Sequence, residues 1–137
     1  MWVGIVWVPM LVEDGVEAAE RAARRFNDTR VEQFYDAGHH AGKAIAAGLG
    51  GPGEIAWDIY LFYPAGSLWQ NAPPLPEVWM HQLSASWAPA AYRRCGPDLT
   101  EHLHTTMDRL TRRGGDGESI RTHSGVLTVE QIHRFMY

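Results

Sequence analysis

The chain has little of what thiol, metal or membrane chemistry requires. Its 137 residues contain a single cysteine, Cys95, so an internal disulfide, a C-x-x-C redox pair and a cysteine-based zinc site are all excluded. Lysine occurs once and the formal net charge is −4, so no basic face predicts binding to nucleic acid or to an anionic membrane. The apolar run at residues 1–12 is too short to span a bilayer and lacks the flanks of a signal peptide, which leaves the compartment open.

Seven histidines do not form a metal motif. His39 and His40 are adjacent and diverge on a helix, and His102 and His104, two residues apart, do not share a helix face either. No H-E-x-x-H or H-x-x-x-H pair occurs, whereas zinc needs three or four convergent ligands. The sequence therefore predicts no metal site, and it indicates no cofactor.

The pattern of hydrophobic residues predicts one α/β domain. Hydrophobic residues make up 45% of the chain and charged residues 20%, which is ordinary for a globular core. Both alternating faces of residues 2–9 are apolar, as is typical of an interior strand covered on two sides. Further strands are expected at residues 29–36, 55–63 and 78–83, and helices at residues 15–26, 37–48 and 96–110.

Acidic residues stand where these helices begin. Asp14 with Glu17, and Asp98 with Glu101, have the spacing of a capping box, in which two side chains satisfy the first backbone amides of a helix. Asp36 is expected to cap the helix that follows it.

The end of the chain predicts a separate short helix. Thr128 and Gln131 form a further cap pair, and an apolar stripe follows, consisting of Val129, Ile132, Phe135 and Met136. Such a helix either folds back on the body or binds a partner. We therefore divide the chain into a domain at residues 1–111, a flexible linker at 112–125 and an amphipathic helix at 126–137.

The segments RVEQFYD, AWDIYLFYPAGSLW and PPLPEVWMHQL, in this order of elements, resemble the thioredoxin-like family over about residues 2–110. The resemblance covers the C-terminal two thirds of such a domain. It implies a mixed central sheet flanked by helices, incomplete at its N-terminus and followed by a short C-terminal helical extension. It assigns residues 2–9 to the central strand after the redox helix, 55–63 and 78–83 to an antiparallel hairpin, and 96–110 to the closing helix.

The resemblance also implies that the redox chemistry is missing. The family's Cys-bearing helix start would lie before Met1, so no low-pKa thiolate is available to attack a disulfide. The family keeps a cis-proline just before the third strand, and residues 54–57 contain no proline.

Three residues suggest a catalytic alternative. Asp58 lies in an otherwise apolar strand and His81 in its expected partner strand, so the two side chains are expected to face each other. One interpretation is a structural hydrogen bond that fixes the strand register. The other is an acid/base pair that activates Cys95, which follows two arginines that would favour its thiolate.

Two features suggest a binding alternative. Pro73, Pro74 and Pro76 form a PxxP run, which either binds an SH3-type groove or stiffens a long connection between strands. Trp69 in the same loop is expected to be the most exposed tryptophan, and it could stack on a planar ligand.

From the sequence, then, we expect a non-catalytic folding or interaction domain, or the remnant of a thiol-disulfide redox protein. Its expected partner is another protein or a second copy of the chain. The alternatives are a thiol-dependent enzyme using Cys95 with His81 and Asp58, and a binding module using the proline-rich loop and Trp69.

Overall fold

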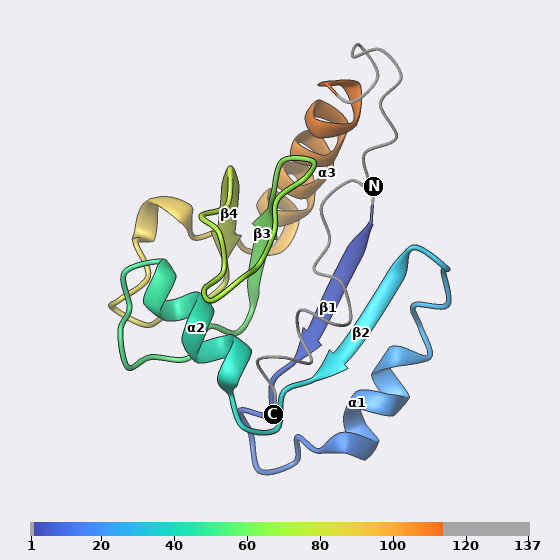
Figure 1. The fold of residues 1–137 in the computed structure, drawn as a ribbon, viewed down its shortest axis with the longest axis vertical. Coiled ribbons are helices and arrows are strands. Elements are labelled where there is room, and N and C mark those ends of the chain that lie inside the picture. The colour runs from blue at the N-terminus through green and yellow to red at the C-terminus, as the bar shows by residue number, and fades with distance from the viewer. Residues whose placement is uncertain (1, 114–137) are drawn as a thin grey trace.

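A computed structural model of the chain describes residues 2–113, which form a mixed α/β fold (Figure 1). The elements follow one another in the predicted order: β1 (Val3–Trp7), α1 (Val16–Ala23), β2 (Val31–Tyr35), α2 (His40–Gly48), β3 (Ile59–Phe62), β4 (Val78–His81), a 3₁₀ turn (Ala90–Tyr92) and α3 (Gly96–Arg113). Within residues 2–113, no helix is both long and apolar enough to cross a membrane.

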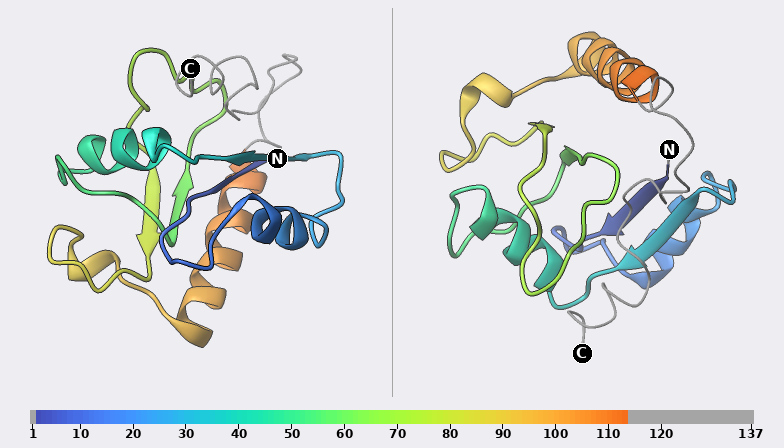
Figure 2. Two further views of the ribbon diagram at one scale, coloured as in Figure 1. Left: turned by 90° about the horizontal axis from the view of Figure 1, so that it is seen from below. Right: turned by 45° about the horizontal axis from the view of Figure 1, so that its top comes forward.

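The four strands form two separate sheets. β1 and β2 pair in parallel and are joined by α1, whereas β3 and β4 pair antiparallel as a hairpin. Figure 2 shows the strands of the two sheets running in different directions. The predicted α/β class and hairpin are confirmed, but the single mixed sheet is wrong for the described residues. The strand predicted at residues 55–63 is also shorter than expected, because Asp58 with φ 50° lies outside the strand region and β3 begins at Ile59.

The prediction that residues 2–9 form an interior strand is also wrong. In the described part of the chain β1 pairs with β2 alone, and Trp2 and Val3 are each 41% exposed. α1 covers one face of this sheet, where the Trp7 and Phe26 rings lie 6.3 Å apart and the Gln33 amide donates to the carbonyl oxygen of Ala23 at 3.0 Å. The apolar pattern on both faces indicates that these side chains are buried in the folded state. It does not show which strands or helices cover them.

Asp36 accepts backbone amides at the start of α2, as predicted, although His39 and not Asp36 occupies the N-cap position; it also joins the parallel sheet to this helix. Its carboxylate is fully buried and accepts the backbone N–H groups of His40 at 2.8 Å and Gly42 at 3.1 Å. Its own backbone N–H donates to the carbonyl oxygen of Trp7 at 2.9 Å. At Gly42, α2 lies close to the segment that contains Ile55, because a Cβ at Gly42 would lie 2.9 Å from Cγ2 of Ile55.

The buried apolar residues gather around α2, the hairpin and the loops beside it. Half of them are alanines, so the described core is thin: Ala41, Ala46, Ala56, Ala88, Trp69, Met80, Leu83 and Leu99.

α3 runs two residues past the predicted domain boundary at residue 111. Its last turn is tied to the start of β4, because the Arg113 guanidinium donates to the Glu77 carboxylate at 2.8 Å. The linker from residue 114 onward and the amphipathic helix predicted at residues 126–137 lie outside the described residues.

Candidate functional site

The structure does not bring the predicted acid/base pair together. Asp58 is exposed and precedes β3, whereas His81 is fully buried at the end of β4. In the register of the hairpin Ile59, not Asp58, stands opposite His81. Asp58 contributes its backbone carbonyl, which accepts the N–H of Gln82 at 3.0 Å. The expectation that the two side chains face each other is therefore wrong, and the positive φ of Asp58 is the physical reason.

The contacts of His81 are those of a structural histidine. Its Nε2 lies 3.0 Å from the carbonyl oxygen of Pro89, and its ring stacks on Trp79 with centroids 5.6 Å apart. Trp79 in turn contacts the ring of Tyr92 at 4.7 Å. The Nδ1 atom is buried and has no hydrogen-bond partner among the residues that the structure describes. His81 thus fastens the 3₁₀ turn to β4.

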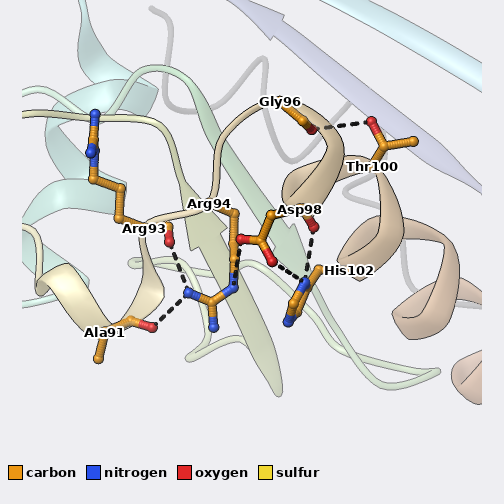
Figure 3. Close-up of polar contacts among 7 residues, drawn as sticks. All are labelled: Ala91, Arg93, Arg94, Gly96, Asp98, Thr100 and His102. Atoms are coloured by element: carbon orange, nitrogen blue, oxygen red, sulfur yellow. Dashed lines mark hydrogen bonds and ion pairs between the residues drawn. The ribbon is translucent and has the colours of Figure 1, made fainter.

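Cys95 is exposed and directly precedes α3. Its sequence neighbours Arg94 and Gly96 belong to a polar cluster (Figure 3). The guanidinium of Arg94 donates to two backbone carbonyls at 2.8 and 3.0 Å and lies 3.6 Å from the carboxylate of Asp98. Asp98 also lies 3.1 Å from Nδ1 of His102, so its side chain bridges two neighbours instead of forming the predicted capping box. In the described residues Cys95, His81 and Asp58 share no hydrogen bond, and the catalytic set stays a sequence-based prediction.

The proline-rich loop packs on the body of the domain. Pro73, Pro74 and Pro76 are half-buried and line a small cavity together with side chains of α2 and β3. Trp69 is only 4% exposed, so the prediction that it is the most exposed tryptophan is wrong. A large aromatic side chain gains more free energy from burial than any other, and the loop folds so as to cover it. The interpretation of the prolines as a stiff connection fits these contacts.

Five of the seven histidines lie in the part of the chain that the structure describes: His39, His40, His81, His102 and His104. Across residues 2–113, no three His, Cys, Asp or Glu side chains are placed to hold one metal ion. A shallow open hollow along α3 includes Glu101, His104 and Asp108 in its lining, and this trio is not grouped as a metal site either.

The feature that the sequence analysis missed is the loop between β1 and α1. We call residues 10–16, which end at the first residue of α1, the apolar loop, because they present three large apolar side chains to solvent. Leu11 is 65% exposed, Val12 is fully exposed and Val16 is 52% exposed. In the sequence this segment continues the apolar run of the strand, whereas β1 ends at Trp7. The available signal was Pro9, since a proline rarely continues a paired strand.

Asp14 fixes the conformation of the apolar loop. One carboxylate oxygen accepts the backbone N–H groups of Met10 and Leu11, both at 2.8 Å, and the Asp14 N–H donates back to the Leu11 carbonyl at 3.0 Å. The hydrogen bond from Leu11 and then that from Met10 lower the pKa of Asp14 below its ordinary value. The predicted capping role of Asp14 is wrong, since the N-cap of α1 is Gly15 and carries no side-chain cap.

The residue that precedes the apolar loop, Pro9, is anchored next to α2. Nε2 of His39 lies 2.7 Å from the carbonyl oxygen of Pro9, and His39 adopts a left-handed backbone with φ 57° directly before α2. Asp14 thus closes the loop on itself and His39 holds the residue before it, while Leu11, Val12 and Val16 remain exposed. Such an arrangement can bind an apolar surface with little loss of backbone entropy.

Comparison with protein-family models, with curated proteins and with solved structures found no match for this chain.

Proposed function

We propose that this chain is a non-catalytic interaction domain that binds a protein partner through its apolar loop. The observation that carries the proposal is the full exposure of Val12, beside Leu11, on a loop whose backbone Asp14 holds in place. Single exposed apolar residues are common on protein surfaces, but adjacent ones on a fixed loop favour an interaction site.

The free energy available from burying Leu11 and Val12 is sufficient for a specific interaction. Burying a leucine or valine side chain contributes about 1.5–3 kcal/mol, so Leu11 and Val12 together contribute about 4 kcal/mol when a partner covers them. That corresponds to roughly a thousandfold in affinity. Because the loop is already ordered, little of this gain is lost to ordering it on binding.

The charges around the apolar loop indicate what the partner looks like. Glu13 and Asp14 lie within the loop and Glu17 lies in the first turn of α1, so three carboxylates stand within two residues in sequence of an exposed apolar side chain. Complementary charge steers association and selects partners. The partner therefore offers an apolar pocket with arginine or lysine on its rim.

Kinship with thioredoxin-like domains belongs to the same proposal. The order of elements and the antiparallel hairpin support it, and the absence of a C-x-x-C pair accounts for a non-catalytic role. The division into two sheets is the feature that this kinship does not explain.

The test begins with site-specific photo-crosslinking from position 12 in the full chain, in the organism that makes it. The captured protein is then purified, and its dissociation constant for the domain is measured by titration calorimetry. We expect the double variant Leu11→Ser, Val12→Ser to weaken binding by at least a hundredfold. The matched control is Leu75→Ser, since Leu75 is 75% exposed but lies in the proline-rich loop.

An affinity that falls equally in the control and in the double variant would contradict the proposal, because general surface hydrophobicity would then explain the binding. A captured protein whose purified form does not bind would contradict it too. Circular dichroism of each variant shows whether the fold is kept.

A further inference from the structure

Trp57 is a further large apolar side chain that the fold leaves in contact with water. It is 41% exposed, whereas Ala56 directly before it is buried. Tryptophan is highly buried on average in folded proteins, and it is among the commonest hot spots of protein interfaces. The exposure has a local cause. The φ of 50° at Asp58 interrupts the extended backbone, so β3 begins at Ile59 and Trp57 stays outside the hairpin.

The segment that contains Trp57 lies beside the start of the apolar loop. The two segments meet at Gly42 of α2, where a Cβ would lie 3.2 Å from the carbonyl oxygen of Ala56 and 3.7 Å from Cγ1 of Val8. The Ala56 N–H also donates to the carbonyl oxygen of Gly42 at 3.0 Å. In Figure 1 and in the left view of Figure 2, the segment that leads into β3 and the segment that leaves β1 are accordingly neighbours.

These contacts limit the distance between the two exposed groups. Trp57 directly follows Ala56, and the apolar loop begins two residues after Val8. The Cα atoms of Trp57 and Met10 are therefore at most about 20 Å apart. A partner that buries about 800 Å² of a domain covers a patch roughly 30 Å across. One partner on the apolar loop is thus large enough to contact Trp57 as well.

The charge beside Trp57 is negative. Asp58 and Glu54 are exposed, and neither forms an ion pair with a cation among residues 2–113. Burial and then the Asp58 carboxylate raise the pKa of Tyr60, so the negative potential extends along the start of β3. A guanidinium group fits both features at once, because it stacks on an indole face and pairs with a carboxylate.

We propose that Trp57 and Asp58 bind an arginine side chain of the partner that covers the apolar loop. This site depends on the proposed function, because the same partner is held by Leu11 and Val12. The guanidinium lies on the indole of Trp57 and donates to the carboxylate of Asp58. A lysine ammonium lacks the planar group that stacks on the ring, so the site selects arginine over lysine.

The first test is photo-crosslinking in the full chain from position 57, compared with positions 12 and 2. We expect positions 57 and 12 to capture the same protein. Position 2 is the matched control and should not capture it, since Trp2 is also 41% exposed but lies directly before β1, at the end of the strand away from the loop. Capture of that protein from position 12 alone would overturn the proposal and leave the proposed function standing.

The second test is titration calorimetry with the purified partner. Trp57→Ala should weaken binding by about tenfold or more, whereas Trp2→Ala should bind as the native chain does. Asp58→Asn should weaken binding at low salt and much less at high salt, because it removes only the charge. Asparagine tolerates a positive φ as aspartate does, so this variant keeps the backbone. Equal affinities of Trp57→Ala and Trp2→Ala, or no effect of Asp58→Asn at low salt, would overturn the proposal.

The arginine is located by mass spectrometry of the peptide that is crosslinked to position 57. Replacing that arginine with lysine should weaken binding to the native chain but have little effect on binding to Trp57→Ala, because the stacked pair is already lost there. An equal loss with both chains would refute the stacking, and so would a crosslinked peptide without arginine. If Leu11→Ser with Val12→Ser binds as the native chain does, the proposed function itself fails, so the two failures are told apart.

Discussion

Asp36→Ala should destabilise the fold more than any other single replacement of a carboxylate among residues 2–113. The side chain is fully buried at the junction of β1, β2 and α2. Replacing it with alanine leaves the N–H groups of His40 and Gly42 without their acceptor. The second of these donors is buried, so water cannot replace the lost partner.

The expected loss follows from these two bonds. Removing a helix-capping carboxylate costs about 1 kcal/mol, and leaving a buried donor unsatisfied costs about 2 kcal/mol. The sum is about 3 kcal/mol, which lowers the urea midpoint by about 2 M at an m value of about 1.5 kcal/mol/M. Asp36→Asn keeps one of the two acceptors and should lose about half as much.

Urea unfolding followed by tryptophan fluorescence measures these differences in the full chain. Asp108→Ala serves as the control, because Asp108 is exposed and its nearest cation, Arg112, lies 4.0 Å away. Its loss should stay within about 0.5 kcal/mol. If Asp36→Ala unfolds at the same urea concentration as Asp108→Ala, Asp36 does not hold the two strands and α2 together, and the account of the junction is wrong.

Three further predictions concern burial. Burial raises the pKa of Tyr63 to about 12, so stability should fall as the pH rises from about 10, where an unfolded tyrosine ionises, to about 12, and Tyr63→Phe should remove that part of an alkaline unfolding curve. Trp69→Ala should cost about 3–5 kcal/mol in urea unfolding, whereas the exposed Leu75→Ser should be nearly neutral. A Cβ at Gly51 would lie 2.5 Å from an indole carbon, so Gly51→Ala should lower the melting temperature, whereas Gly15→Ala, with open space around it, should not.

Each of these predictions has a contrary result. An alkaline unfolding curve unchanged by Tyr63→Phe would mean that this side chain is accessible in the folded state. A loss in Trp69→Ala no larger than in Leu75→Ser would restore Trp69 as an exposed binding residue. Equal melting temperatures for the two glycine variants would show that the ring beside Gly51 can move aside.

The sequence predicted the order of elements because periodicity is a local property. The helix expected at residues 96–110 is an example, found as α3 at Gly96–Arg113, and the acceptor role of Asp36 at the start of α2 is another. Both depend on residues within a few positions of one another. The neighbours of β1 are not local. Its apolar pattern is the same whether two strands or one lie beside it, so the single sheet was predicted and two were found.

The candidate site was harder to predict because single backbone angles decide it. Nothing in the run around Asp58 indicates a φ of 50°, yet that angle separates the carboxylate from His81. The Asp14 carboxylate accepts hydrogen bonds from Met10 and Leu11, but the sequence equally allowed it to cap the following helix. The sequence alone does not show which of these two roles is more stable. Prolines were the informative residues: Pro9 marks the end of β1, and the loop at Pro73 packs on the body.

The central claim is that the chain acts by binding through the apolar loop and not through its thiol. The most direct measurement is titration calorimetry of the purified partner with three forms of the full chain: native, Leu11→Ser with Val12→Ser, and Cys95→Ser. The account predicts that the loop variant binds at least a hundredfold more weakly and that Cys95→Ser binds as the native chain does. Loss of binding in Cys95→Ser, with the loop variant unaffected, would contradict it.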